Sequence, residues 1–158
     1  MLRMALTGHR PERLKYNQYL ETDDWRRIID WVKGQIRTLG VTDAYCGMAD
    51  GGDCAYAVAV IELKNEGWPV KLHCVLPCDN YNSDHYLYDL FKENADTWTS
   101  LSKHFYKGCD DVRDQYMVDN SDKLFAIYDG IKVGGVYYTI QKAHKKNLEI
   151  IYYPKELL

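Results

Sequence analysis

The sequence predicts a single α/β domain over residues 1–158, in which a mostly parallel sheet lies between two layers of helices. Apolar runs alternate with helix-period segments along the whole chain, a pattern typical of strands joined by crossover helices. A length of 158 residues is within the usual size of one domain. The composition, 46% hydrophobic and 27% charged, is that of a globular protein and excludes a disordered chain.

The chain opens with a predicted strand at residues 3–6, followed by a long polar loop at 7–21. Loops of that length are often functional. An amphipathic helix follows, which we expect Thr22 to cap and Gly40 to end. Its apolar residues recur at three- and four-residue steps and should face the core: Trp25, Ile28, Ile29, Val32, Ile36 and Leu39.

Two further strands, at residues 41–46 and 70–76, flank a helix of small residues. A glycine-containing loop at 47–52 leads into this helix, which we expect at 53–65. The small side chains that would let the helix lie close to the sheet are Ala55, Ala57 and Ala59.

The second half of the chain alternates helices and strands in the same way. A helix is expected to end near Asn94, after a polar stretch that runs through Asp84. The run Leu-Phe-Ala-Ile-Tyr within 123–128 indicates a central strand. The remaining expected elements are a weak strand at 99–104, a helix at 110–120, a last helix that opens at 130–135 and runs to about residue 146, and a strand at 148–152.

Charge and hydropathy argue against a protein that binds nucleic acid through its overall charge and against a membrane protein. The 20 basic and 23 acidic side chains leave a formal charge of -3, so we expect no nucleic acid partner held by the overall field, although a local basic patch stays open. The longest apolar run, at 55–61, is too short to cross a bilayer. The apolar segment at the start is too short for a secretory signal, so we expect no membrane contact and a cytoplasmic location.

The cysteines indicate reduced thiols rather than a disulfide framework, because their number is odd and no Cys-x-x-Cys pair occurs. His73, Cys74 and Cys78 lie close in sequence, but their spacing matches no common zinc pattern. We therefore predict no metal site. The five cysteines are Cys46, Cys54, Cys74, Cys78 and Cys109.

Three glycine-containing turns follow predicted strands, at residues 7–10, 47–52 and 134–135. The carboxyl ends of parallel strands share one edge of the sheet, so the three turns should converge there. Glycine lets a backbone amide approach a ligand closely, and the helix after each turn directs free N–H groups at an anion. Phosphate is therefore the expected ligand group. None of the turns is a Gly-x-Gly-x-x-Gly or Walker lysine motif, which speaks against ordinary dinucleotide binding and ATP hydrolysis.

The first turn carries the candidate side chains of the N-terminal region. Arg10 stands beside Gly8 and could fork onto a phosphate. His9 titrates near neutral pH and is the candidate general base, with an exposed loop histidine as the alternative we favour. Arg13 and Lys15 are expected to lie in a solvated loop.

Further candidates follow the later strands. Arg113 either reaches the crevice or forms an ion pair with Asp110 or Asp114, and spacing leaves both alternatives open. Asp53, just after two glycines, is expected to cap a helix, with a ribose hydroxyl as the other partner it could hold. Asp119 is expected to orient the turn into the next strand rather than to act in a catalytic pair.

Four motifs stand in order along nearly the full chain: Thr7-Gly8-His9-Arg10-Pro11, Gly47-Met48-Ala49-x-Gly51-x-Asp53, Arg113-x-x-x-Met117-Val118-Asp119-x-Ser121-Asp122 and Gly134-Gly135-x-x-x-Thr139-Ile140. Together they resemble the SLOG superfamily, and within it the YpsA-like branch of bacterial and phage proteins. The resemblance implies a Rossmann-like domain that binds a nucleotide or nucleotide derivative at a glycine-lined crevice. Relatives in that superfamily include cytokinin-activating phosphoribohydrolases, a single-strand DNA-binding protein of natural transformation, and sensors of ADP-ribose-type signals.

The turns and the resembling motifs together give the predicted ligand-binding set. The residues are Thr7, Gly8, His9, Arg10, Gly47, Met48, Ala49, Gly51, Gly52, Asp53, Arg113, Asp119, Gly134 and Gly135. The phosphoribohydrolases carry a glutamate after their glycine turn, which acts with an arginine on the N-glycosidic bond. In this chain the stretch from Val136 to Gln141 holds no carboxylate, and a carboxamide cannot take over that role. Arg113 is similar to the family arginine, but the resemblance supplies no catalytic partner for it.

Three functions follow from the resemblance. The first is a binding protein that senses or sequesters a phosphorylated ribose ligand, with no further cofactor. The second is a nucleotide N-glycosidase that recruits its acid from Asp50, Asp53 or Asp119. The third is a single-strand DNA-binding module, which the 14 tyrosines favour and the net charge opposes. Relatives often pair as dimers and the surplus tyrosines would suit an interface, so we expect a homodimer.

Overall fold

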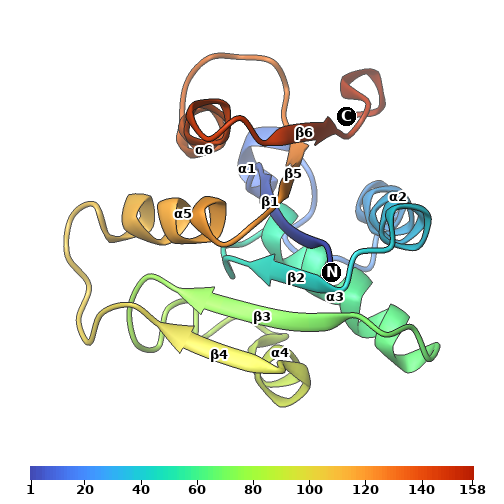
Figure 1. Ribbon diagram of the computed structural model, residues 1–158, viewed down its shortest axis with the longest axis horizontal. Helices are drawn as coiled ribbons and strands as arrows, with labels where there is room; N and C mark the ends of the chain where they lie inside the picture. The colour runs from blue at the N-terminus through green and yellow to red at the C-terminus, as the bar shows by residue number, and fades with distance from the viewer.

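The computed structural model describes residues 1–158 and contains one six-stranded sheet in the order β4-β3-β2-β1-β5-β6 (Figure 1). Every neighbouring pair of strands is parallel, which confirms the predicted α/β class. The strands are β1 (Arg3–Gly8), β2 (Asp43–Cys46), β3 (Lys71–Leu76), β4 (Thr97–Ser100), β5 (Lys123–Ile127) and β6 (Glu149–Tyr152). The helices are α1 (Pro11–Leu14), α2 (Asp23–Leu39), α3 (Gly52–Asn65), α4 (Tyr88–Asn94), α5 (Cys109–Asp119) and α6 (Gly135–Lys145), with a final 3-10 turn, η1 (Lys155–Leu157).

Strand β1 divides the core between the two faces of the sheet. Met4 and Leu6 belong to the larger apolar cluster with residues of α2 and α3, whereas Ala5 belongs to the smaller cluster with residues of α5 and α6. Alternate residues of a strand point to opposite faces, so α2 and α3 cover one side and α5 and α6 the other (Figure 1). Helix α3 packs over β1, β2 and β3 at the centre of the sheet.

Small side chains hold α3 close to that sheet, as the sequence predicts. Ala55, Ala57 and Ala59 are fully buried. Next to them, the Tyr56 hydroxyl donates a hydrogen bond of 2.8 Å to the Met4 carbonyl of β1, which satisfies the phenol in an otherwise apolar environment. The start of α3 is thereby fixed relative to the end of β1.

Three sequence-based expectations about local structure are wrong. The segment 7–21 is not all loop, because β1 continues to Gly8 and Pro11–Leu14 form the short helix α1. Thr22 occupies the position before α2 but makes no capping bond, and its hydroxyl lies buried without a partner. Strand β4 ends at Ser100 rather than at residue 104, because its partner β3 ends at Leu76, opposite Ser100.

No disulfide bond crosslinks this core. All five cysteines are buried as free thiols, as expected from their number and spacing. No helix of the structure combines the length and the apolar character needed to cross a membrane.

Candidate ligand-binding site

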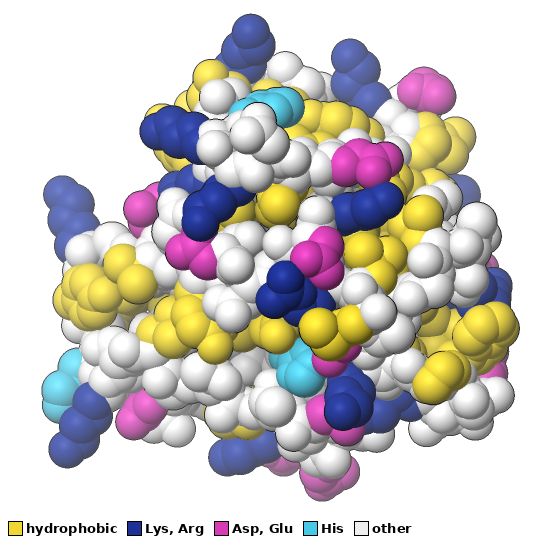
Figure 2. Space-filling view, viewed as in Figure 1, with side chains coloured by type: hydrophobic (Ala, Val, Ile, Leu, Met, Phe, Trp, Pro, Cys, Tyr) yellow, Lys and Arg dark blue, Asp and Glu magenta, His cyan; other side chains and the backbone are white.

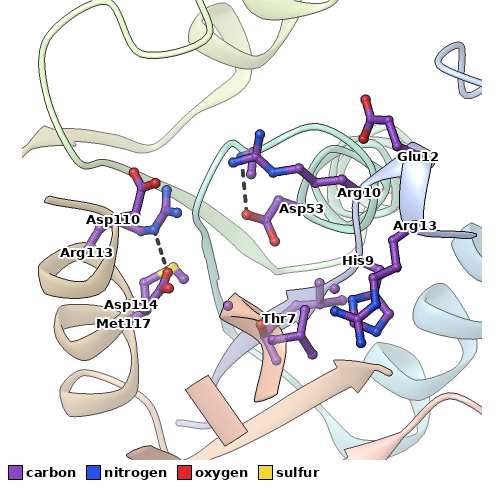
Figure 3. A pocket seen from close by; sticks show the side chains of 15 residues that line it. Thr7, His9, Arg10, Glu12, Arg13, Asp53, Asp110, Arg113, Asp114 and Met117 are labelled. Atoms are coloured by element: carbon purple, nitrogen blue, oxygen red, sulfur yellow. Dashed lines mark hydrogen bonds and ion pairs between the residues drawn. The ribbon is translucent and has the colours of Figure 1, made fainter. Parts of the chain in front are cut away.

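A cavity of about 330 Å³ opens at the carboxyl edge of the sheet (Figure 3). Its volume lies at the lower end of the range typical of small-molecule sites. The end of β1, helix α1, the β2–α3 loop and helices α5 and α6 all contribute to its walls. The lining residues are Leu6, Thr7, Gly8, His9, Arg10, Glu12, Arg13, Ala49, Asp53, Asp110, Arg113, Asp114, Met117, Gly135 and Val136.

Glycines let the backbone segments around this cavity approach one another. Gly51 has a φ of +85°, and a Cβ there would stand 2.6 Å from the His9 carbonyl oxygen. A Cβ at Gly47 would stand 2.9 Å from a carboxylate oxygen of Asp53 and 3.2 Å from the guanidinium carbon of Arg113. The β2–α3 loop therefore carries glycine because the polypeptide and two charged side chains fill the space that a side chain would need.

Arg113 is a buried cation in the α5 wall of the cavity, with 4% of its surface exposed. Its Nε donates to Asp114 at 2.7 Å and its Nη1 donates to the Gly47 carbonyl. Burial alone would lower the pKa of Arg113, but the Asp114 and Asp53 carboxylates overcome it and raise that pKa. Both predicted alternatives for Arg113 are therefore correct, because it lines the cavity and also forms an ion pair with Asp114.

Asp53 lies across from Arg113, in the first turn of α3 (Figure 3). Its Oδ2 accepts the Ala49 N–H at 3.2 Å, so the carboxylate braces the β2–α3 loop rather than capping its own helix. Burial raises the pKa of Asp53 to about 7, and the opposing effect of Arg113 is too weak to cancel it. A carboxyl group that exchanges protons near neutral pH therefore borders the cavity.

His9 and Arg13 converge on Asp129 at the other side of the cavity. His9 is 3% exposed, so the favoured alternative of an exposed loop histidine is wrong. Its Nε2 accepts the Asp129 backbone N–H at 3.2 Å, and burial lowers the pKa of His9 despite the nearby Asp129 carboxylate. The same Nε2 lies 3.2 Å from the Asp129 carboxylate, so this ring nitrogen is engaged in holding the segment after β5.

Arg13 is not solvated as predicted but anchors the loop that leads into α6. Its Nε and Nη2 donate to the two carboxylate oxygens of Asp129 at 2.8 and 2.9 Å. Two further bonds reach the carbonyls of Ile131 and Val133. Gly134 follows with a φ of +98°, and a Cβ there would stand 2.8 Å from the Arg13 guanidinium. Arg13 therefore sets the position at which α6 begins.

Arg10 remains the one cavity arginine without an acidic partner. Its Nη2 lies 3.4 Å from the Tyr81 hydroxyl, and the Arg113 guanidinium stands over the ring of the same tyrosine at 5.5 Å. Figure 3 shows the Arg10 side chain extending toward Asp53 across the cavity. Arg10 is exposed, so it is free to meet an incoming anion.

The family model YpsA, described as the YspA SLOG family, matches residues 4–157. The chain belongs to the YspA SLOG family. A solved structure of DNA processing protein A from Helicobacter pylori, described by its single-stranded DNA binding mode, is similar in fold with a TM-score of 0.65 and 14% sequence identity. The match covers 97% of this chain and 65% of that chain, so this SLOG protein spans about two thirds of that protein's length. The comparison with curated proteins yields no match.

The structure brings most of the predicted residues of this SLOG chain to the cavity. Eight of them line it: Thr7, Gly8, His9, Arg10, Ala49, Asp53, Arg113 and Gly135. Gly47, Gly51, Gly52 and Gly134 lie behind this lining and set the approach of its backbone segments. Met48 belongs to the β2–α3 loop and is buried with a φ of +69°, and its carbonyl accepts a hydrogen bond from Asn82.

Asp119 is the predicted residue that the structure does not bring to this cavity. Its carboxylate accepts hydrogen bonds from Gln115 at 2.9 Å and pairs with Lys146 at 2.8 Å. Asp119 stands one helical turn beyond Gln115 at the exposed end of α5, away from the lining residues. Its part in the SLOG motif is therefore a contact between α5 and the end of α6.

Several lining residues carry no predicted role in the sequence. Glu12 and Arg13 belong to helix α1, which the sequence does not predict. Tyr81, in the β3–α4 loop, contacts Arg10 and Arg113 but is not a lining residue. Spacing along α5 indicates which residues share the Arg113 face, since Met117 lies one turn away and lines the same wall. The lining residues that do not belong to the predicted ligand-binding set are Leu6, Glu12, Arg13, Asp110, Asp114, Met117 and Val136.

A second, smaller cavity lies on the other side of the β2–α3 loop. Asp50 and His85 line it, and with Cys54 they place three ligand-type atoms within 4.8 Å of one another. The His85 Nδ1 accepts the Leu87 N–H at 3.0 Å, which leaves the proton of the neutral ring on Nε2, and the Cys54 thiol donates to the Ala49 carbonyl. The Asp50 carboxylate, which accepts a hydrogen bond from Asn82 at 2.8 Å, and the Cys54 thiol are thus engaged within the protein, whereas His85 Nε2 has no hydrogen-bond partner.

Proposed function

We propose that this SLOG protein binds a nucleotide or a nucleotide derivative such as ADP-ribose in the 330 Å³ cavity, and that it senses or sequesters the ligand without turnover. The observation that carries the proposal is the convergence of the three glycine turns on one cavity. The end of β1, the β2–α3 loop and the start of α6 all border it. Family membership and the Rossmann-like fold support a nucleotide-related ligand.

The start of α6 supplies the anion site of this proposal. Gly135 and Val136 line the cavity, and neither a capping side chain nor an acidic residue occupies the first turn of the helix. Backbone N–H groups and the positive end of the helix dipole are therefore available to a phosphate. Arg10 adds an exposed cation to the lining of the same cavity.

Calorimetric titration with AMP, ADP-ribose, NAD and cyclic ADP-ribose isomers tests the proposal. We expect at least one of them to bind with a Kd well below about 1 mM, and the variant Arg10→Ala to weaken it by about 10- to 100-fold. Arg27→Ala is the matched control, because Arg27 is an exposed arginine of α2 paired with Asp24. Millimolar or weaker binding of every nucleotide would remove the proposal.

A second candidate, nucleotide N-glycosidase activity, is favoured by Asp53 alone among the three acids considered for it. Asp53 borders the cavity with a pKa raised by burial to about 7, as a general acid requires. Asp50 lies on the second cavity, and Asp119 pairs with Lys146. Release of free base from nucleoside monophosphates, abolished in Asp53→Asn and retained in Asp111→Asn, would establish catalysis; intact substrate after long incubation would exclude it.

Single-stranded DNA is the third candidate, because the similar Helicobacter pylori protein is described as binding it. The expectation that this chain has no nucleic acid partner is weakened by that similarity. Figure 2 nevertheless shows Lys and Arg side chains interspersed with Asp and Glu, without one continuous basic stripe on that face. Anisotropy titration of a labelled oligothymidine decides the matter, since tight binding with a steep salt dependence would favour DNA. A homodimer stays an expectation that light scattering can test.

A further inference from the structure

The cavity presents far less free positive charge than its composition indicates. Three arginines and four carboxylic acids line it. Arg13 is bound to both oxygens of Asp129, and Arg113 is bound to Asp114 and the Gly47 carbonyl. Arg10 alone has no carboxylate partner. The site can therefore offer one side-chain cation to a ligand.

Two nearly buried residues that line the cavity each have a polar side-chain atom without a hydrogen-bond partner in the protein. Thr7 is 7% exposed and lines the cavity, yet its hydroxyl makes no hydrogen bond within the protein. Asp53 is 6% exposed, and only its Oδ2 is bonded, to the Ala49 N–H, which leaves Oδ1 without a donor. Because both residues line the cavity, these two atoms are available for hydrogen bonds to a bound ligand. The hydroxyl suits a phosphate oxygen, and the carboxylate oxygen suits a hydroxyl or amino group.

Two of the four cavity carboxylates lie on its α5 wall. Asp110 and Asp114 project from α5, while Thr7 and Arg13 lie on the other side of the cavity (Figure 3). Asp114 is satisfied by Arg113 Nε, but Asp110 accepts no nitrogen or oxygen donor. A second phosphate extending toward α5 would meet these acids and find no free cation.

We propose that the cavity selects a phosphomonoester of a hydroxylated sugar, such as a nucleoside monophosphate, and discriminates against ligands with a second phosphate. The single phosphate occupies the start of α6 with Thr7 and Arg10, and a sugar hydroxyl donates to Asp53 Oδ1. The inference rests on the proposed nucleotide binding and narrows it, because ADP-ribose carries two phosphates. The small volume of the cavity, about 330 Å³, agrees with this choice.

Parallel calorimetric titrations with AMP, ADP, ATP, ADP-ribose and ribose 5-phosphate, in buffer with EDTA and no divalent cation, test this order. We expect AMP to bind about tenfold tighter than ADP and ADP-ribose, and ATP to bind more weakly still. Binding of ADP or ADP-ribose as tight as that of AMP would overturn the inference while leaving nucleotide binding intact. Failure of all five probes would remove the proposed function together with this inference.

Charge variants on α5 separate electrostatic exclusion from a simple lack of space. Asp110→Asn removes a carboxylate from the cavity wall at almost constant size, so the ratio of ADP to AMP affinity should rise severalfold. Asp111→Asn is the matched control, because the neighbouring Asp111 side chain is 66% exposed, pairs with Lys142 and does not line the cavity. An unchanged ratio in Asp110→Asn, or an equal rise in Asp111→Asn, would refute the acidic wall as the cause.

Discussion

Gly52 at the start of α3 and Gly8 at the end of β1 are in direct backbone contact: a Cβ built on Gly52 would stand 2.7 Å from the Cα of Gly8 and 3.1 Å from its carbonyl carbon. The Gly52 N–H also donates to the His9 carbonyl at 3.1 Å. This contact joins two of the three glycine turns, so the shape of the cavity depends on the absence of side chains at both positions.

Gly52→Ala is accordingly expected to destabilise the fold by about 1–3 kcal/mol, because the added methyl group meets backbone atoms that cannot rotate away. Urea denaturation measures the change in the free energy of unfolding. Gly34→Ala is the control within α2, where no atom lies within 4 Å of the built Cβ, and it should stabilise by up to about 1 kcal/mol. Equal effects of both substitutions would show that crowding at Gly52 is unimportant.

The sequence predicts the sheet and the glycine turns because both have local signals. Helix α2 follows from its wide apolar stripe, and its buried residues Trp25, Ile28 and Val32 are among those predicted. The four-residue helix α1 has no such periodicity, and Arg13 finds Asp129 at a separation of 116 residues. A contact between residues so far apart leaves no pattern in one sequence, which is why Arg13 was expected in solvent.

The sequence leaves Asp110 and Asp114 both open as ion-pair partners of Arg113. Adjacent helical residues do not usually face each other, yet the Nε of Arg113 reaches its neighbour Asp114 at 2.7 Å, and both side chains are largely buried. Within one motif, Arg113 and Met117 line the cavity, whereas Asp119 pairs with Lys146 at the end of α6. Sequence motifs thus located the cavity but could not distinguish residues that border it from residues that support it.

Substitution of Thr22 tests whether this residue caps helix α2, as the sequence predicts. A working cap would lose about 1 kcal/mol of stability on substitution by alanine. The Thr22 hydroxyl is buried without a hydrogen-bond partner, so it costs desolvation free energy and no bond offsets that cost. We therefore expect Thr22→Val, which removes this hydroxyl, to leave the stability unchanged or to increase it. Thermal denaturation of the two proteins in the same buffer measures the difference. A loss near 1 kcal/mol in Thr22→Val would instead indicate a functional cap.

Asp129 should make the protein sensitive to acid. Hydrogen bonds from Arg13 lower the pKa of Asp129 to about 2, below its ordinary value near 3.9. The folded state therefore binds fewer protons than the unfolded state, and this stabilisation is complete above about pH 5 and is lost as the pH falls toward 2. We expect Asp129→Asn to cost about 1–2 kcal/mol at pH 6 and little at pH 2, by urea denaturation at each pH. A cost independent of pH would show that charge is not involved.

Arg113 and Asp114 should be strongly coupled, because their side chains are only 5% and 19% exposed. Arg113→Met leaves a buried carboxylate without its cation and is expected to cost about 3–5 kcal/mol. In Asp114→Ala, Arg113 keeps the nearby Asp53 carboxylate and its hydrogen bond to the Gly47 carbonyl. The double variant should lose less than the sum of the two single variants by about 1 kcal/mol or more, in a double-mutant cycle of unfolding free energies. Simple additivity would mean that the pair does not act as a unit.

Asp53 should have the opposite pH dependence from Asp129. Burial raises the pKa of Asp53 to about 7, so between about pH 4 and pH 7 the folded state binds more protons than the unfolded state, and stability falls as the pH rises through that window. Asp53→Asn keeps an oxygen for the Ala49 N–H and removes the buried charge. The stability of this variant relative to the natural protein should therefore increase between pH 5 and pH 8, by roughly 1–3 kcal/mol in urea denaturation.

The control variant Asp111→Asn, in an exposed position, should show no comparable change of stability with pH. If the Asp53→Asn difference is the same at both pH values, the carboxyl group is ionised throughout, and the general-acid role considered for the glycosidase candidate loses its physical basis.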